Sequence, residues 1–317
     1  MNSVHFHKTN YHLKTYGKLK TPSFLRKGDK TGIAVPARKI SPEELQPAID
    51  ILKNWGFEPV LASNIYDKHH QYAGTDSDRI RGFQELLDNE EIKAILCARG
   101  GYGSMRIIDE LDFSVFKKKP KWIAGYSDVT VFHSHLNKLF ETETLHCTMP
   151  LNFANNTPEA LESLRKALSG EQIIHTAPGH ELNRAGEAKG IVTGGNLSIL
   201  YALSCSVSDM DSNGKILFIE DLEEYLYHID RMMVQLKRSG KLQNLAGLVV
   251  GGMNNMNDNT VPFGKTAYEI IAEHVAEYDY PVCFGFPAGH IDDNRTLIMG
   301  RKIKFDVSDN KSEIGFL

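Results

Sequence analysis

A serine, a glutamate and a histidine occupy positions in this chain from which their side chains could act together on a carbonyl carbon. Ser127 follows the short apolar run 122–124 and precedes an expected helix over 129–139. The hydroxyl of a serine at such a strand-to-helix turn lies at a helix N-terminus, where free backbone N–H groups can stabilise an oxyanion. Glu220 comes directly after an apolar, strand-like run, and His290 comes after another strand and a glycine turn. Serine, acid and histidine, in this order, is one of the arrangements found in hydrolytic triads.

Each of these residues also has a plainer interpretation. A serine at a helix start commonly serves only as an N-cap, and Val129 stands where the elbow of an α/β-hydrolase has glycine. The acidic run 220–224 is typical of a solvated helix start, and it could also form a divalent-metal site. Asp221 is the rival of Glu220 for the role of the acid. The spacing alone therefore leaves these alternatives open.

A second glycine turn, Arg-Gly-Gly-Tyr-Gly at 99–103, follows the apolar run 94–97. Glycines allow a backbone to approach a phosphate or a reacting carbonyl without a Cβ clash. A nucleotide-binding fingerprint would be expected after the first strand, but the chain has Val-Pro-Ala-Arg at 35–38 instead. The turn by itself is weak evidence for either kind of site.

The histidines do not suggest a metal centre. His133 and His135 are two residues apart on an expected helix and face different directions, so they cannot bind one ion together. His5, His7 and His12 lie in the N-terminal tail, where no structural zinc is expected. We predict no metal and no cofactor.

Five motifs, in matching order and spacing, resemble those of the LD-carboxypeptidases. This family of serine peptidases also includes the microcin-C self-immunity peptidases, and the resemblance extends from about Pro22 to the C-terminus. The motifs are Arg99-Gly100-Gly101-Tyr102-Gly103, Gly125-Tyr126-Ser127-Asp128, Gly194-Gly195-Asn196-Leu197, Glu220-Asp221 and Gly289-His290.

The resemblance implies a serine carboxypeptidase of murein recycling. Such an enzyme cuts the L,D-peptide bond before the terminal D-alanine of a murein tetrapeptide, in the cytoplasm, as a homodimer and without a metal. The triad that it implies is Ser127, Glu220 and His290. The residues that it implies for the oxyanion hole and for substrate binding are Gly100, Gly101, Asp128 and Asn196.

The composition argues against several other classes of protein. The net charge of −4 argues against a nucleic-acid-binding surface, which is usually basic. No apolar run reaches 18 residues, so no membrane-spanning helix is expected, and the N-terminus lacks the apolar segment of a secretory signal. A cytoplasmic location is the default. The cysteines are expected to be reduced, and most of them buried: Cys97, Cys147, Cys205 and Cys283.

Strands that alternate with helices predict a parallel α/β sheet, in which ligands bind at the carboxyl ends of the strands. We predict an N-terminal flavodoxin-like or glutamine-amidotransferase-like domain and a smaller C-terminal α/β domain with short strands, with the active site in the cleft between them. The predicted division is 1–21 for an extension, 22–168 for the first domain, 169–189 for a linker and 190–317 for the second domain. The expected strands are 31–35, 57–62, 92–97, 122–124, 144–150, 190–193, 216–219 and 245–250. One helix is expected to begin near Pro42. The other expected helices span 75–87, 105–111, 129–139, 197–203, 225–239 and 264–277.

Two other functions remain alternatives. The first is a peptidase that acts on a microcin-like aminoacyl nucleotide. The second is a non-catalytic α/β protein that binds a nucleotide or a small anion through the two glycine turns, and such a protein would have no need of Glu220 or His290.

Overall fold

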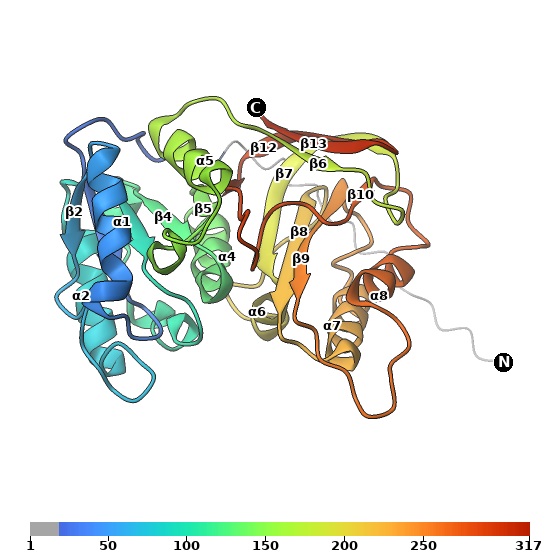
Figure 1. Cartoon of the computed structure of the whole chain (residues 1–317), viewed down its shortest axis with the longest axis horizontal. Coiled ribbons are helices and arrows are strands. Elements are labelled where there is room, and N and C mark those ends of the chain that lie inside the picture. The colour runs from blue at the N-terminus through green and yellow to red at the C-terminus, as the bar shows by residue number, and fades with distance from the viewer. Residues whose placement is uncertain (1–18) are drawn as a thin grey trace, which may run out of the picture.

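Figure 1 shows the computed structural model of the chain, in which two β-sheets lie side by side and each is covered by helices. The structure describes residues 19–317. Of the predicted extension 1–21, only the last three residues are therefore described, and the tail histidines lie outside them. Lys20 pairs with Thr142, so the end of this segment is docked beside the first sheet.

The N-terminal sheet has the strand order of a flavodoxin-like fold. Its first five strands are parallel, as predicted, and they follow the order β2-β1-β3-β4-β5. A sixth strand, β11, comes from the C-terminal part of the chain and pairs with β5 in the antiparallel sense. The strands, across the sheet, are β11 (Leu297–Met299), β5 (Thr144–His146), β4 (Trp122–Gly125), β3 (Ile92–Cys97), β1 (Lys30–Ala34) and β2 (Glu58–Leu61).

Helices cover both faces of this sheet. Side chains of α1 (Pro42–Asn54) and α5 (Pro158–Ser169) belong to one buried cluster, and those of α2 (Asp76–Asp88) and α4 (Thr130–Leu139) belong to another. Helices α1 and α2 begin with capping boxes at Ser41 and Thr75. The shorter helical segments are η1 (Ser104–Arg106), η2 (Ile108–Glu110), α3 (Ser114–Lys118), η3 (Ser127–Val129) and η4 (Pro150–Asn152).

The C-terminal sheet is mixed. Four strands are parallel, and the remaining three continue the sheet in the antiparallel sense. The strands, across the sheet, are β10 (Val282–Cys283), β9 (Gly247–Asn254), β8 (Ile216–Leu222), β7 (Gly186–Asn196), β12 (Lys302–Val307), β13 (Lys311–Phe316) and β6 (Ile174–Pro178). The helices packed on its parallel part are α6 (Leu197–Ala202), α7 (Leu226–Arg238) and α8 (Ala267–His274).

Three details differ from the sequence-based prediction. The expected helix over 105–111 is two short 3-10 turns, η1 and η2, because buried apolar residues three positions apart fit that tighter spiral as well. The predicted linker 169–189 contains β6 and the start of β7. The strands of this half are also longer than expected, since β7 alone has 11 residues.

Strand β6 was not predicted because its partner strand lies far away in the sequence. It pairs with β13, and its alternating burial follows from that pairing rather than from a strong local pattern. The boundaries of the two domains stay a prediction.

The remaining expectations concern cysteines and membranes. Cys97, Cys147 and Cys283 are buried, Cys205 is exposed, and all four are free thiols. Within residues 19–317 there is no helix with the length and apolar character needed to span a membrane.

Candidate active site

Ser127 lies on a strained turn at the carboxyl end of β4. Its φ angle is +62°, a conformation that non-glycine residues rarely adopt and that often marks functional turns. Gly125 has a φ of +150°, and a Cβ there would lie 2.8 Å from a methyl group of Val129. The bulk of Val129 is therefore accommodated by the glycine on the other side of the serine, which explains how the turn forms without a glycine at position 129.

The turn 99–103 packs directly against this serine. A Cβ at Gly100 would lie 3.1 Å from Cβ and 3.2 Å from Oγ of Ser127, and only a glycine leaves room beside the hydroxyl. The next residue, Gly101, has a φ of +105° and faces the side chain of Arg38, whose Cδ would lie 2.5 Å from a Cβ at this position. The loops after β1, β3 and β4 thus meet at one edge of the sheet.

The carboxylate of Asp128 joins two of these loops. It is buried, and its Oδ2 accepts a hydrogen bond of 2.8 Å from the backbone N–H of Ser104. Burial raises the pKa of this carboxyl. Arg79, which is also buried, donates to the carbonyls of Pro36 and Gly103 and so ties the loop after β1 to the same turn.

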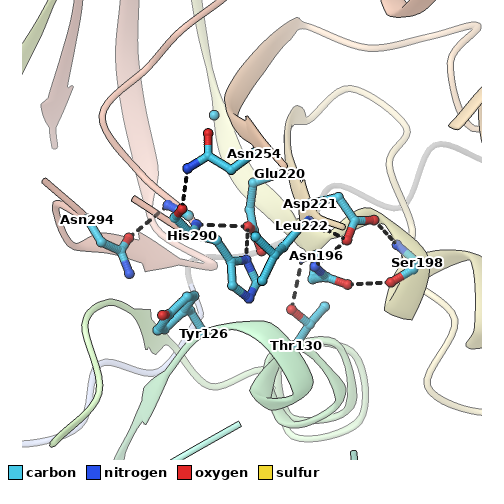
Figure 2. A network of polar contacts seen from close by, with 12 residues as sticks. Tyr126, Thr130, Asn196, Ser198, Glu220, Asp221, Leu222, Asn254, His290 and Asn294 are labelled. Atoms are coloured by element: carbon cyan, nitrogen blue, oxygen red, sulfur yellow. Dashed lines mark hydrogen bonds and ion pairs between the residues drawn. The ribbon is translucent and has the colours of Figure 1, made fainter. Parts of the chain in front are cut away.

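Glu220 and His290 form a tight pair in the second half of the molecule (Figure 2). Nδ1 of His290 lies 2.6 Å from Oε2 of Glu220, and the backbone N–H of His290 donates to the same oxygen at 3.2 Å. Gly289 makes this approach possible, because its φ is +107° and a Cβ there would lie 2.7 Å from Oε2. Asn254 donates to the carbonyl of His290, and Asn294 accepts from the N–H of Gly289.

The charges of this pair reinforce each other. Burial alone would raise the pKa of Glu220, but the charge and hydrogen bond of His290, together with the nearby ring of His146, lower it to about 2. Burial lowers the pKa of His290, but attraction and hydrogen bonding from Glu220 outweigh it, so the pKa of His290 is raised overall. The result is an ionised carboxylate that stabilises an imidazolium.

Asp221 points to a different set of partners. Its two oxygens accept from the side-chain amide of Asn196 and from the backbone N–H of Ser198, at 2.9 and 2.8 Å. Burial and the charge of Glu220 raise the pKa of Asp221 to about 7. The alternation along β8 therefore separates the two rival acids, and Glu220 is the one in contact with His290.

Asn196 connects the two halves of the molecule. Its side-chain oxygen caps α6 by accepting from the N–H of Ile199, and its own backbone N–H donates to Oγ1 of Thr130 at 3.0 Å. These bonds engage its backbone N–H and both atoms of its side-chain amide group within the protein. They give Asn196 a role in holding α4 against β7.

Tyr126 connects the turn of Ser127 to His290. The ring of this residue, immediately before Ser127, packs edge-on against the ring of His290 with 4.8 Å between centroids. Within residues 19–317 the hydroxyl of Ser127 makes no hydrogen bond. Hydrogen bonds between nucleophile and base are often long in free enzymes and tighten in the complex with substrate.

Sequence reasoning named Tyr126 only as part of the motif 125–128, and it did not identify Thr130, Arg79 or His146 as parts of this region. The only signal for His146 was its place at the end of the expected strand beside the one that leads to Ser127. In the described part of the chain there is no group of three or more metal-ligating side chains, and His133 and His135 bond separately to Thr144 and Ser208.

Family models account for most of the chain. The model of the LD-carboxypeptidase N-terminal domain matches residues 31–147, and the model of the LD-carboxypeptidase C-terminal domain matches residues 189–305. The chain belongs to the LD-carboxypeptidase family. The region that matches the N-terminal model of the LD-carboxypeptidases contains Ser127 and the two glycine turns. The region that matches the C-terminal model contains Glu220 and His290.

Individual relatives agree with this assignment. A protein named probable murein peptide carboxypeptidase, from Bacillus subtilis, is 30% identical over 92% of this chain and 93% of its own length. The murein tetrapeptide carboxypeptidase of Pseudomonas aeruginosa is 26% identical over 86% of this chain and 91% of its own length.

Solved structures of the family have the same fold. The muramoyltetrapeptide carboxypeptidase from Oxalobacter formigenes superposes with a TM-score of 0.82 at 27% identity, over 90% of this chain and 98% of that one. The microcin self immunity protein MccF has a TM-score of 0.83 at 23% identity, over 94% of this chain and 98% of that one.

Proposed function

We propose that the protein is a serine LD-carboxypeptidase that releases the terminal D-alanine from murein tetrapeptides. The observation that carries the proposal is the 2.6 Å contact between His290 and the buried Glu220. The ring of His290 packs against Tyr126, which directly precedes the strained Ser127 in the chain. A protein that only binds an anion would gain nothing from a buried glutamate and histidine. The names of relatives that cover over 85% of the chain support the murein substrate.

In the proposed mechanism, Ser127 attacks the scissile carbonyl and His290 takes its proton. The ionised carboxylate of Glu220 can only accept hydrogen bonds, so Nδ1 of His290 carries the hydrogen and Nε2 of the neutral ring is free to act as the base. The same nitrogen then returns the proton to the leaving D-alanine. Glu220 fixes the tautomer and stabilises the charged ring.

The oxyanion would be held by backbone donors at the two glycine turns. We assign this role to the N–H of Asp128 and to the N–H groups of Gly100 or Gly101, which lie beside the serine. One such donor contributes on the order of 3 kcal/mol to the transition state. Neither step requires a metal or a cofactor.

An exopeptidase must also recognise a free carboxylate, and Arg38 is placed for this. Its side chain packs on Gly101, next to the glycine that touches Ser127, and it is exposed. Within the described residues its guanidinium forms no ion pair or hydrogen bond, whereas Arg99 is engaged by Lys39 and Glu44. We assign to Arg38 the binding of the carboxylate of the terminal D-alanine, as the planar fork of arginine suits a carboxylate.

The test is mass spectrometry of free tetrapeptide and disaccharide tetrapeptide after incubation with the protein. Loss of one D-alanine from either, by the wild type and not by Ser127→Ala, is the expected result. No D-alanine release from lysine- or diaminopimelate-containing peptides would contradict the proposal.

The second candidate is a peptidase for aminoacyl nucleotides. It draws on the fold shared with MccF, one structure of which is in complex with aspartyl sulfamoyl adenosine. Hydrolysis of an aminoacyl sulfamoyl nucleotide in preference to the tetrapeptide would favour it. We also keep the cytoplasmic location and the homodimer as predictions, which cell fractionation and light scattering can check.

A further inference from the structure

His146, the last residue of β5, is a buried polar side chain to which the mechanism above gives no part. It is fully buried, and neither of its ring nitrogens has a hydrogen-bond partner among the described residues. Its surroundings are mostly aromatic, with the rings of Phe218 and Tyr126 at 4.8 and 6.0 Å between centroids. A buried polar group without a partner is rare in folded proteins because it loses its bonds to water and gains none in return.

The nearest polar atom that also lacks a hydrogen-bond partner belongs to the pair of Glu220 and His290. Oε1 of Glu220 is buried and lacks a hydrogen-bond partner, and it lies 4.0 Å from Nε2 of His146. The other oxygen, Oε2, already accepts from His290. A donor and an acceptor, both sealed from water, thus face each other about 1 Å beyond hydrogen-bond distance.

His133, the neighbouring buried histidine, shows the contrast. Its two ring nitrogens are each 2.9 Å from a partner, Oγ1 of Thr144 and the carbonyl of Gly125. Both of its polar atoms are therefore satisfied within the N-terminal sheet. His146 lies on the same sheet, but its free nitrogen is directed to the acid of the other sheet.

We propose that His146 is a positioning residue of the triad, whose Nε2–H donates to Oε1 of Glu220 in the reacting enzyme and holds the carboxylate from the side opposite to His290. The torsion that rotates a glutamate carboxylate is soft, so a single hydrogen bond leaves its plane poorly fixed. A second donor on the other oxygen fixes that plane and with it the direction of the His290 ring. This inference rests on the proposed function.

The position of His146 gives the contact a further consequence. His146 pairs in the sheet with Gly125, two residues before Ser127, and the backbone N–H of Cys147 donates to the carbonyl of Gly125. The proposed hydrogen bond therefore links the strand that carries the nucleophile to the acid of the C-terminal sheet. It sets the distance between the two halves of the triad.

The experiment compares variants that remove or retain the donor. His146→Phe and His146→Met remove it, and His146→Gln retains an amide N–H near the same place. The matched control is His175→Phe, which removes a buried histidine from β6 with no contact to Glu220. Each is assayed for kcat and KM of D-alanine release from the tetrapeptide, after circular dichroism and thermal unfolding.

We expect the phenylalanine and methionine variants to lose about 10- to 100-fold in kcat with KM nearly unchanged, as for other residues that orient a functional group. His146→Gln should recover part of the loss, and His175→Phe should retain the wild-type kcat. In a Glu220→Gln background, His146→Phe should cause little further loss, because it acts through that carboxylate. A wild-type kcat in the two apolar variants, a loss equal to that of the control, or a fully additive loss with Glu220→Gln would overturn the inference.

A measurement independent of turnover separates this inference from the proposed function. In proton NMR, the His290 Nδ1–H bonded to Glu220 should give a low-field resonance that shifts or broadens in His146→Phe and persists in His175→Phe. An unchanged resonance in both would overturn the role of His146 even if the enzyme is active. If the wild type releases no D-alanine, the proposed function fails, while the NMR comparison still decides the contact.

Discussion

The two sheets hold their parts of the site in opposite ways. At the carboxyl edge of the N-terminal sheet, the backbone places Ser127 through a strained φ angle and two close glycines, and its hydroxyl has no hydrogen bond within the described residues. At the corresponding edge of the C-terminal sheet, side-chain hydrogen bonds hold Glu220, Asp221 and His290 (Figure 2).

In the proposed mechanism, this difference separates nucleophilic attack from the orientation of the acid and the base. A nucleophile that must move toward a substrate benefits from a hydroxyl free of competing bonds. An acid and a base that must keep one tautomer benefit from hydrogen bonds that hold their side chains in place. Substitutions in the first region should therefore affect chemistry and binding with little loss of stability, whereas those in the second should affect both.

The largest effect is expected at the serine. Ser127→Ala should lower kcat for D-alanine release by several orders of magnitude, because triad members act as a unit. The melting temperature should change little, since the hydroxyl holds nothing in place. D-Alanine release by purified Ser127→Ala at a rate near that of the wild type would contradict the serine mechanism.

The two adjacent acids of β8 should differ strongly. Glu220→Gln should lower kcat by up to about 10⁴-fold, because the amide removes the charge that stabilises the imidazolium and selects the tautomer. Asp221→Asn should keep kcat within about tenfold and lower the melting temperature instead, because Asp221 accepts from Asn196 and Ser198. A severe loss of kcat in Asp221→Asn, with Glu220→Gln active, would mean that the acid is misassigned.

Arg38, the arginine beside the glycine turn, should affect binding. Arg38→Gln should raise KM by about tenfold or more, the usual value of a hydrogen bond to a charged group, with a smaller change in kcat. Arg99→Gln is the matched control, since that arginine is already engaged by Lys39 and Glu44. Equal changes in both variants would argue against a specific carboxylate partner.

The pH profile should follow the histidine. His290 must be neutral to accept a proton, and its pKa is raised by Glu220, so kcat/KM should fall tenfold per unit below a pKa that lies above 6.5. In Glu220→Gln the residual activity should show this acid limb at lower pH, because the charge that raised the pKa is gone. If the acid limb stays at the same pH in Glu220→Gln, the group that titrates in the profile is not His290.

Chelation should have the smallest effect. A Ser, His and Glu mechanism needs no ion, so dialysis against EDTA should leave kcat unchanged. Loss of activity that zinc or magnesium restores would support the metal interpretation of the acidic run 220–224 instead.

Local sequence signals predicted much of this arrangement. The helices expected from Pro42 and over 75–87 are both present, and the ends of adjacent parallel strands place the turn 99–103 next to Ser127. The two rival acids of β8, Glu220 and Asp221, have different partners.

Pairings between distant segments could not be predicted in this way. Strand β6 and strand β11 pair with partners more than 130 residues away, and no local pattern encodes the identity of a partner. The approach of His146 to Glu220 depends on how two sheets meet, which is a property of the packed molecule. The need for a glycine at position 289 has the same kind of cause, because the side chain that a Cβ there would meet belongs to the distant Glu220.

Strand β11 has a consequence for the biosynthesis of the protein. It closes the edge of β5, although Leu297–Met299 leave the ribosome long after Thr144–His146. The nascent N-terminal half therefore emerges with an unprotected sheet edge next to the strand of the nucleophile, and such edges can pair with other chains. The hydrolase therefore completes its first sheet only after residues of its C-terminal half have been translated.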